Sequence, residues 1–148
     1  MPGTDIHTLA RLPLLRGSNR RQLMHIARLT TAIDAPPERV LCEQGTLGQH
    51  FYVVLKGRAA VVRDGRLLAL LGRGDWFGEM AFSTADQTRS ATVKAVTSTT
   101  LLVFGRVGYR TLLETCPQAA ARIAEREAAR VANLAAPAGS APVTTLAG

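Results

Sequence analysis

The spacing of apolar residues divides the chain into a helical beginning, a middle part of short strands and a helical end. Pro13 keeps the first apolar residues from forming one long helix, and helical spacing then continues to about Leu29. Ser18 is a good N-cap, because its hydroxyl can accept a hydrogen bond from a free N–H group of the first turn. We therefore expect a helix over residues 18–29. Its buried face would consist of Leu23, Ile26 and Ala27.

Beyond Pro36 and Pro37 the apolar period changes to two, and the runs become short and rich in β-branched and aromatic residues. Asp64 and Gly65, between two such runs, are a strong signal for a two-residue hairpin turn. The expected strands cover residues 40–43, 51–55, 59–62, 67–71, 91–96 and 101–104. Short strands separated by glycine-containing turns indicate a β-sandwich or a jelly-roll barrel.

From Gly105 the spacing is helical again, and Pro117 separates one helix from the next. The first of these helices has a clear apolar stripe of Tyr109, Leu112 and Leu113. The second, over residues 117–134, is rich in the helix-favouring Ala, Arg and Glu. Its weaker stripe consists of Ala120, Ile123, Ala124, Glu127, Val131 and Leu134. We expect one domain over residues 1–134, with its core at about 12–130, and a flexible tail over the small and polar residues 135–148.

Composition narrows the class of protein further. The chain has 148 residues, 47% hydrophobic, and a net charge of +7 that comes almost entirely from arginine. The arginines are scattered without a basic run, so specific nucleic-acid binding is not expected from charge. Their abundance beside alanine fits a GC-rich bacterial genome.

Cys42 and Cys116 are too few for a disulfide framework, which indicates free thiols in a reducing cytoplasm. No apolar run approaches the ~20 residues of a membrane span, and we expect a cytoplasmic protein without a membrane partner.

Residues 72–95, GRGDWFGEMAFSTADQTRSATVKA, combine groups that can hold a phosphate. Glycines allow tight bends before Glu79, from which EMAF can begin a short helix whose first N–H groups are free to bind an anion. Arg89 follows ten positions later, and its guanidinium can bind two phosphate oxygens at once, while small Ser90 and Ala91 let a ligand reach the backbone. The carboxylate of Glu79 would repel a phosphate, but it can accept a hydrogen bond from a hydroxyl such as a ribose 2′-OH. Trp76 and Phe77 are expected to anchor this stretch in the core.

The motifs FGEMA and RSATVKA, in this order, closely resemble the phosphate-binding cassette of the cyclic nucleotide-binding domains. This family includes the catabolite activator proteins and the regulatory subunits of cAMP-dependent protein kinase. The turn glycines of EQGTLGQHFYVVLKG and the stretch LPLLRGSNRRQLMHIA extend the resemblance over residues 12–130. It implies a mainly β (α+β) fold, a jelly-roll β-barrel with N-terminal helices and two C-terminal helices. The ligand-binding residues that it implies are Gly78, Glu79, Met80, Ala81, Arg89, Ser90, Ala91, Val61 and Leu68.

The chain departs from the family pattern in two places. Gln49 stands where an Asp is common, and the last helix has no aromatic residue to cover the base. Ile123, Val131 or Leu134 would have to take that place, or Asn133 could offer a hydrogen bond to the base edge. The resemblance favours cAMP as the ligand and leaves cGMP open. It also makes the last helix a candidate seam for a homodimer, with a helix merely packed on the barrel as the alternative.

The inventory of reactive side chains argues against an enzyme. A jelly-roll metal enzyme needs clustered His and carboxylate ligands, whereas His7, His25 and His50 are isolated, and no nucleophile–base pair is apparent. We therefore expect a stand-alone cyclic nucleotide sensor without catalysis, metal or cofactor, which acts on an unknown protein effector. One alternative is a transcription regulator of the catabolite activator type. Residues 135–148 are too few for its helix-turn-helix, so this alternative requires that the sequence is a fragment of a longer regulator. The other is a degenerate domain that has lost its ligand and serves as an interaction module.

Overall fold

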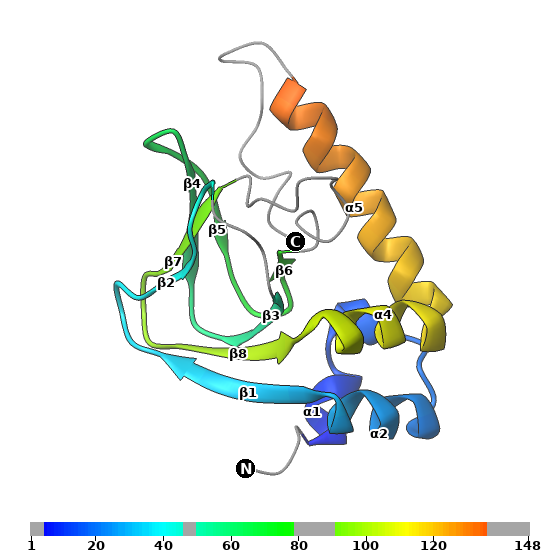
Figure 1. The fold of residues 1–148 in the computed structure, drawn as a ribbon. Helices are drawn as coiled ribbons and strands as arrows, with labels where there is room; N and C mark the ends of the chain where they lie inside the picture. Colours follow the sequence, from blue (N-terminus) through cyan, green and yellow to red (C-terminus); the bar gives the residue numbers. More distant parts are fainter. Residues whose placement is uncertain (1–4, 46–49, 79–90, 136–148) are drawn as a thin grey trace.

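The computed structural model describes residues 5–45, 50–78 and 91–135 (Figure 1). In these residues, eight strands form two four-stranded antiparallel sheets, with the orders β1-β8-β3-β6 and β2-β7-β4-β5. Figure 1 shows α1, α2 and α4 gathered at one end of the two sheets, from which α5 extends alongside them. The expected α+β fold, a jelly-roll β structure with helices before it and two helices after it, is confirmed.

Most elements lie where the apolar spacing predicts them. The helices are α1 (Ile6–Ala10), the 3₁₀ turn η1 (Pro13–Leu15), α2 (Arg20–Arg28), α4 (Arg106–Thr115) and α5 (Pro117–Ala135). The strands are β1 (Thr30–Ala35), β2 (Val40–Cys42), β3 (Phe51–Lys56), β4 (Ala59–Arg63), β5 (Arg66–Leu71), β6 (Trp76–Phe77), β7 (Thr92–Ala95) and β8 (Thr99–Phe104). The predicted hairpin between β4 and β5 is present, because Asp64 and Gly65 have φ values of 51° and 78°. A two-residue turn that follows the strand twist needs positive φ at both positions.

The sheet β1-β8-β3-β6 separates two cores, because successive residues of a strand point to opposite faces. On one face, Phe51 and Val53 of β3 pack with the helices. On the other face, Tyr52 and Val54 point into the space between the two sheets. All four side chains are therefore buried, which explains why FYVV is a continuous apolar run rather than an alternating one. Burial of each such side chain stabilises the fold by about 1.5–3 kcal/mol.

The first strand of the fold is β1, so the expectation that strands begin at residue 40 is wrong. Only the two ends of β1, Thr30 and Ala35, are buried, and the interior alternation that signals a strand is missing. β1 is held by pairing along its whole length with β8, from Thr30 opposite Phe104 to Ala35 opposite Thr99. Contacts between segments so distant in the sequence leave little local trace. The short strand β6 is likewise not among the strands for which the apolar alternation predicts bounds.

The N-cap of α2 is Asn19, not Ser18 as the sequence suggested. The Asn19 side chain accepts a hydrogen bond from the Gln22 backbone N–H at 2.8 Å, and the Gln22 side chain accepts one from the Asn19 N–H at 2.9 Å. This reciprocal capping box satisfies two N–H groups that the helix itself cannot bond. The Ser18 hydroxyl instead donates to the Cys116 sulfur at 3.6 Å and thereby joins the start of α2 to the end of α4.

Candidate ligand-binding site

The predicted site residues fall into two groups. Glu79, Met80, Ala81, Arg89 and Ser90 lie outside the described residues, and so does Gln49. The described members of the set are Val61, Leu68, Gly78 and Ala91. Gly78 and Ala91 directly precede and follow segment 79–90. Val61 and Leu68 lie on β4 and β5, in the sheet that also contains β7. The site is therefore built here from the elements that flank this segment.

The approach to segment 79–90 is a tight loop that is fixed to β3. The Asp75 side chain accepts a hydrogen bond from the Gly72 N–H at 2.8 Å, and the Gly74 N–H donates to the Val54 carbonyl at 2.8 Å. Gly74 has φ 90°, and a Cβ at this position would lie 3.0 Å from Pro13. Gly78, with φ 99°, follows β6 and turns the chain in the left-handed region that favours glycine. Both glycines thus serve the sharp bends that the sequence predicted for them.

Trp76 and Phe77 anchor β6 on both faces of its sheet. Phe77 is buried between the two sheets, where its ring is stacked on Tyr52 with a centroid separation of 4.7 Å and an interplanar angle of 13°. Trp76 is buried among the helix-side residues. The strand that leads directly into segment 79–90 is therefore held from both sides, as predicted for these two aromatic residues.

The described members of the predicted apolar wall lie together between the sheets. Val61 on β4 is buried, and it is paired with Val93 of β7 and with Ala69 of β5. Leu68 lies at the β-bulge opposite Val61 and Val62, and it packs in a half-buried position against the same cluster. Ala91, immediately before β7, is also half-buried against this cluster. Three of the nine predicted residues thus share one apolar surface next to both ends of segment 79–90.

The helix α5 contributes two arginines that the sequence analysis missed. Arg122 donates from one guanidinium nitrogen to the carbonyls of Leu14, at 2.9 Å, and Arg16, at 2.8 Å. Arg126, one turn further, lies over the ring of Trp76. The available signal was the spacing of four between these arginines, which puts them on one side of the helix. The apolar stripe of the helix alone does not reveal these two arginines.

The predicted apolar stripe of α5 is partly wrong. Ile123 is buried, but Ala124 is exposed, and the fully buried neighbour is Ala119 instead. The stripe was displaced because arginine side chains occupy part of the inner face. Ile123 packs in the helix-side core, which removes it as a candidate for covering a base in this arrangement. The side chains of Glu127, Val131, Asn133 and Leu134 lie outside those that the structure describes.

A two-sheet β-roll with helices before and after it is the class of fold that the described elements define. The comparison with protein families gives the particular family. The model of the cyclic nucleotide-binding domain matches residues 33–116, which is more than half of the chain. The chain therefore belongs to the cyclic nucleotide-binding domain family, as the cassette motifs predicted.

Curated relatives carry the same domain in different proteins. A cyclic nucleotide-gated potassium channel of Rhizobium etli is 32% identical over 115 residues, which cover 78% of this chain and 32% of the channel. The cAMP-dependent protein kinase regulatory subunit of Schizosaccharomyces pombe is 31% identical over 71% of this chain and 26% of the subunit. The cyclic AMP receptor protein of Thermus thermophilus is 37% identical over 65% of this chain and 46% of that protein. The chain thus spans less than half of the length of each of these relatives.

Solved structures agree with this fold. The Thermus thermophilus catabolite activator protein superposes with a TM-score of 0.70 at 34% identity, over 82% of this chain and 59% of that protein. A cAMP-bound PfPKA-R structure has a TM-score of 0.77 over 95% of this chain and 48% of its own, but at 19% identity it supports the fold alone. Among the described residues, no helix is long and apolar enough to cross a membrane.

Proposed function

We propose that this domain is a regulatory sensor of a cyclic nucleotide, and that the nucleotide is cAMP. The observation that carries the proposal is the order of FGEMA and RSATVKA at the two ends of the β6–β7 connection, in a chain that belongs to the cyclic nucleotide-binding domain family. The relatives from S. pombe and T. thermophilus, whose names refer to cAMP, support the choice of nucleotide.

In this proposal each predicted residue has a distinct task. Arg89 binds two oxygens of the cyclic phosphate, and the free N–H groups of Met80 and Ala81 add to the positive end of a short helix. Glu79 accepts a hydrogen bond from the ribose hydroxyl, and Ser90 lies next to the phosphate. The apolar surface of Val61, Leu68 and Ala91 covers the sugar and base. Its position between the sheets, beside both ends of segment 79–90, supports this task.

The signal would leave the site through α5. Trp76 belongs to the strand that enters segment 79–90, and Arg126 of α5 lies over it. A nucleotide that binds one arrangement of this segment better than another shifts the equilibrium between the two, by as much as its affinities differ. The Trp76–Arg126 contact supports α5 as the element that responds, either toward a protein effector or toward a second copy of the domain.

The proposal includes binding without cleavage. Hydrolysis of a cyclic phosphate needs a metal ion or an acid–base pair beside the phosphorus. In residues 5–45, 50–78 and 91–135, no group of three or more His, Cys, Asp or Glu side chains could hold a metal ion. We also propose that the domain acts on its effector from the cytoplasm without binding a specific DNA sequence. A catabolite-activator-type regulator and a ligand-free interaction module remain the competing functions.

Calorimetric titration with cAMP, cGMP and 5′-AMP tests the proposal. We expect saturable binding of one cAMP per chain, weaker binding of cGMP and very weak binding of the open phosphate of 5′-AMP. Chromatography after prolonged incubation should recover cAMP intact. No binding of either cyclic nucleotide would favour the interaction module. Tight, sequence-selective DNA binding at physiological salt would favour the transcription regulator, whereas we expect weak and salt-sensitive DNA binding at most.

A further inference from the structure

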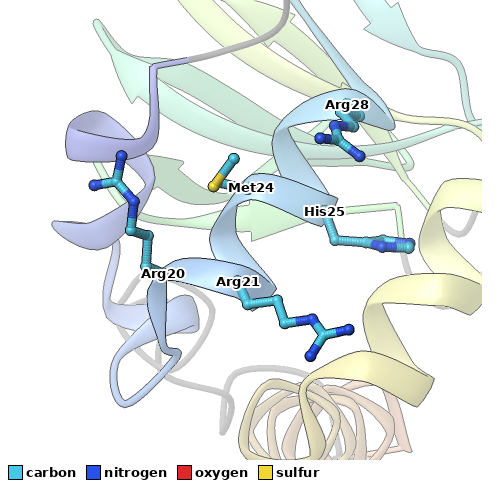
Figure 2. A pocket seen from close by; sticks show the side chains of 5 residues that line it. All are labelled: Arg20, Arg21, Met24, His25 and Arg28. Atoms are coloured by element: carbon cyan, nitrogen blue, oxygen red, sulfur yellow. The ribbon is translucent and has the colours of Figure 1, made fainter.

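The outer side of α2 forms a basic, open pocket of about 520 Å³ on the helical end of the domain. Its lining, which we call the α2 arginine face, consists of Arg20, Arg21, Met24, His25 and Arg28. All five side chains are exposed. Figure 2 shows Met24 between Arg20 on one side and the pair Arg21 and His25 on the other, with Arg28 at the far end of the helix. An apolar centre is thus surrounded by three arginines and a histidine.

The positive charge of this face is not balanced by its surroundings. Residues 5–29 contain five arginines and one acidic residue, Asp5, and α2 itself contains no acid. The neighbouring helix α4 has one acid, Glu114. The ion pairs Lys94–Glu38 and Arg63–Asp64 both lie elsewhere in the fold. The α2 arginine face therefore offers its charges to a group outside the described part of the chain.

Two of these arginines stand where they weaken their own helix. Arg20 and Arg21 are the first two residues of α2, next to the positive end of the helix dipole, and the first turn contains no acidic residue. Cations at this end are unfavourable, whereas Asp or Glu would be favourable. Helix stability therefore does not favour arginine at these two positions, and the charges project outward from a fixed position.

The helix that presents these charges is held firmly in place. Its apolar residues Leu23, Ile26 and Ala27 are buried in the helix-side core. The Gln22 side chain donates to the Thr115 carbonyl at 2.8 Å, which ties α2 to the end of α4. At the other end, Gly108 of α4 approaches Leu29 so closely that a Cβ would lie 3.1 Å from the Leu29 carbonyl oxygen. A partner would therefore meet a preorganised surface and order little of it on binding.

We propose that the α2 arginine face binds an acidic segment of a partner protein that carries an apolar side chain among its carboxylates. Arginine binds carboxylates in a bidentate way, and the flexible Met24 can adapt to an aliphatic side chain at the centre. A nucleic-acid backbone offers phosphates but no apolar group for Met24. A bilayer would need several apolar residues to insert, and the apolar residues of α2 other than Met24 are already buried in the core. An acidic segment with an apolar centre matches both features.

The test uses the nucleotide-free chain, because the inference does not depend on the nucleotide. The probe is a fluorescein-labelled short peptide of Glu and Asp around two central leucines, followed by fluorescence anisotropy. The comparison ligands are a peptide of equal charge with serines in place of the leucines, oligothymidylate, and phosphatidylcholine vesicles that contain phosphatidylserine. We expect the leucine peptide to bind best and to bind more weakly as salt is raised.

The decisive variant is the double substitution Arg20→Glu and Arg21→Glu. It places acids in the first turn of α2, where the dipole favours them, so the melting temperature should not fall. Binding of the leucine peptide should nevertheless weaken about tenfold or more, because attraction is replaced by repulsion. Met24→Ser should weaken binding of the leucine peptide and leave binding of the serine peptide unchanged. Arg66→Glu, an exposed charge reversal on β5, is the matched control and should change the binding of neither peptide.

Three results would overturn the inference. The first is unchanged peptide binding by the double variant that has kept its melting temperature. The second is tighter binding of oligothymidylate or of the vesicles than of the leucine peptide. The third is equal binding of the two peptides, since Met24 would then have no role.

Discussion

The guanidinium carbon of Arg126 lies 4.2 Å from the centroid of the Trp76 ring. These residues join α5 to the strand that enters the β6–β7 connection, across fifty positions of the sequence. A guanidinium over an indole face is attracted by the ring quadrupole, and the attraction is stronger where water is excluded. Trp76 is only 5% exposed. The contact is therefore a specific link between the helix and the proposed site.

We expect Arg126→Ala to lower the free energy of unfolding by about 1–2 kcal/mol, because it removes this contact and part of the cover over Trp76. Urea unfolding followed by tryptophan fluorescence measures the effect directly, since Trp76 is the single tryptophan. Glu125→Ala, an exposed neighbour on α5, is the control and should change little. If the two variants are equally stable, Arg126 does not hold α5 against β6. If the cAMP affinity changes in Arg126→Ala but not in Glu125→Ala, this result would support α5 as the responding element.

Gly57 and Gly65 allow a paired test of backbone strain against close packing. Both have positive φ, 96° and 78°. A Cβ at Gly57 would lie 2.5 Å from the Ser98 carbonyl oxygen, whereas a Cβ at Gly65 would have no heavy atom within 4 Å apart from its chain neighbours. We expect Gly65→Ala to cost about 1–2 kcal/mol from strain alone. Gly57→Ala should cost about 2–5 kcal/mol, because overpacking is added. Thermal unfolding measures both costs, and equal losses would show that β3 and the turn before Thr99 can separate freely.

Cys116 predicts a loss of stability at alkaline pH. Burial raises the pKa of this thiol above its ordinary value of 9.0, and the hydrogen bond from Ser18 partly opposes the rise. The folded chain thus keeps a proton that the unfolded chain releases. This contribution to stability is complete below the unfolded pKa and is lost as the pH rises through the folded pKa. We expect Cys116→Ala to flatten the fall of the unfolding free energy as the pH rises above about 9. Parallel curves for the two proteins would contradict this assignment.

The sequence was informative where structure is decided locally. The run FYVV, the Asp64–Gly65 turn and the glycine before Glu79 each reflect a constraint within a few residues, and so the β-roll could be predicted. β1 could not, because its stability comes from pairing with β8 rather than from its own alternation. Arg122 and Arg126 contact residues that lie far back in the sequence, and no period records such partners. The charge of α2 was visible as scattered arginines, but only the fold shows that they surround Met24 on one exposed side.

Arg89 is the residue on which the proposed function most depends. We expect Arg89→Ala to weaken cAMP binding by roughly 2–5 kcal/mol, because a buried phosphate charge would lose its partner. This corresponds to a loss of affinity on the order of thirty- to several-thousand-fold. Arg89→Lys should recover only part of it, since an ammonium group cannot bind in a bidentate way. Titration calorimetry measures the three affinities beside the exposed control Arg39→Ala. Unchanged affinity in Arg89→Ala would remove this residue from the site.

The choice between cAMP and cGMP turns on Ser90, the residue after that arginine. In the family this position lies near both phosphate and base, and threonine there often accompanies a preference for cGMP, because its hydroxyl can meet the guanine 2-amino group. Alanine accompanies cAMP, and serine occurs in bacterial members that bind cAMP. We therefore expect a modest preference for cAMP, since one exposed hydrogen bond contributes only about 0.5–1.5 kcal/mol.

Two substitutions separate the contribution of this hydroxyl from the rest of the site. Ser90→Thr should narrow or reverse the preference for cAMP, because the added methyl group restricts the hydroxyl to fewer rotamers. Ser90→Ala should weaken cGMP more than cAMP, because only guanine loses a hydrogen-bond partner. Competition titrations of the original chain and both variants give the ratio of the two affinities in each. If this ratio stays constant, Ser90 does not contact the base, and the discrimination must come from the C-terminal helix, α5.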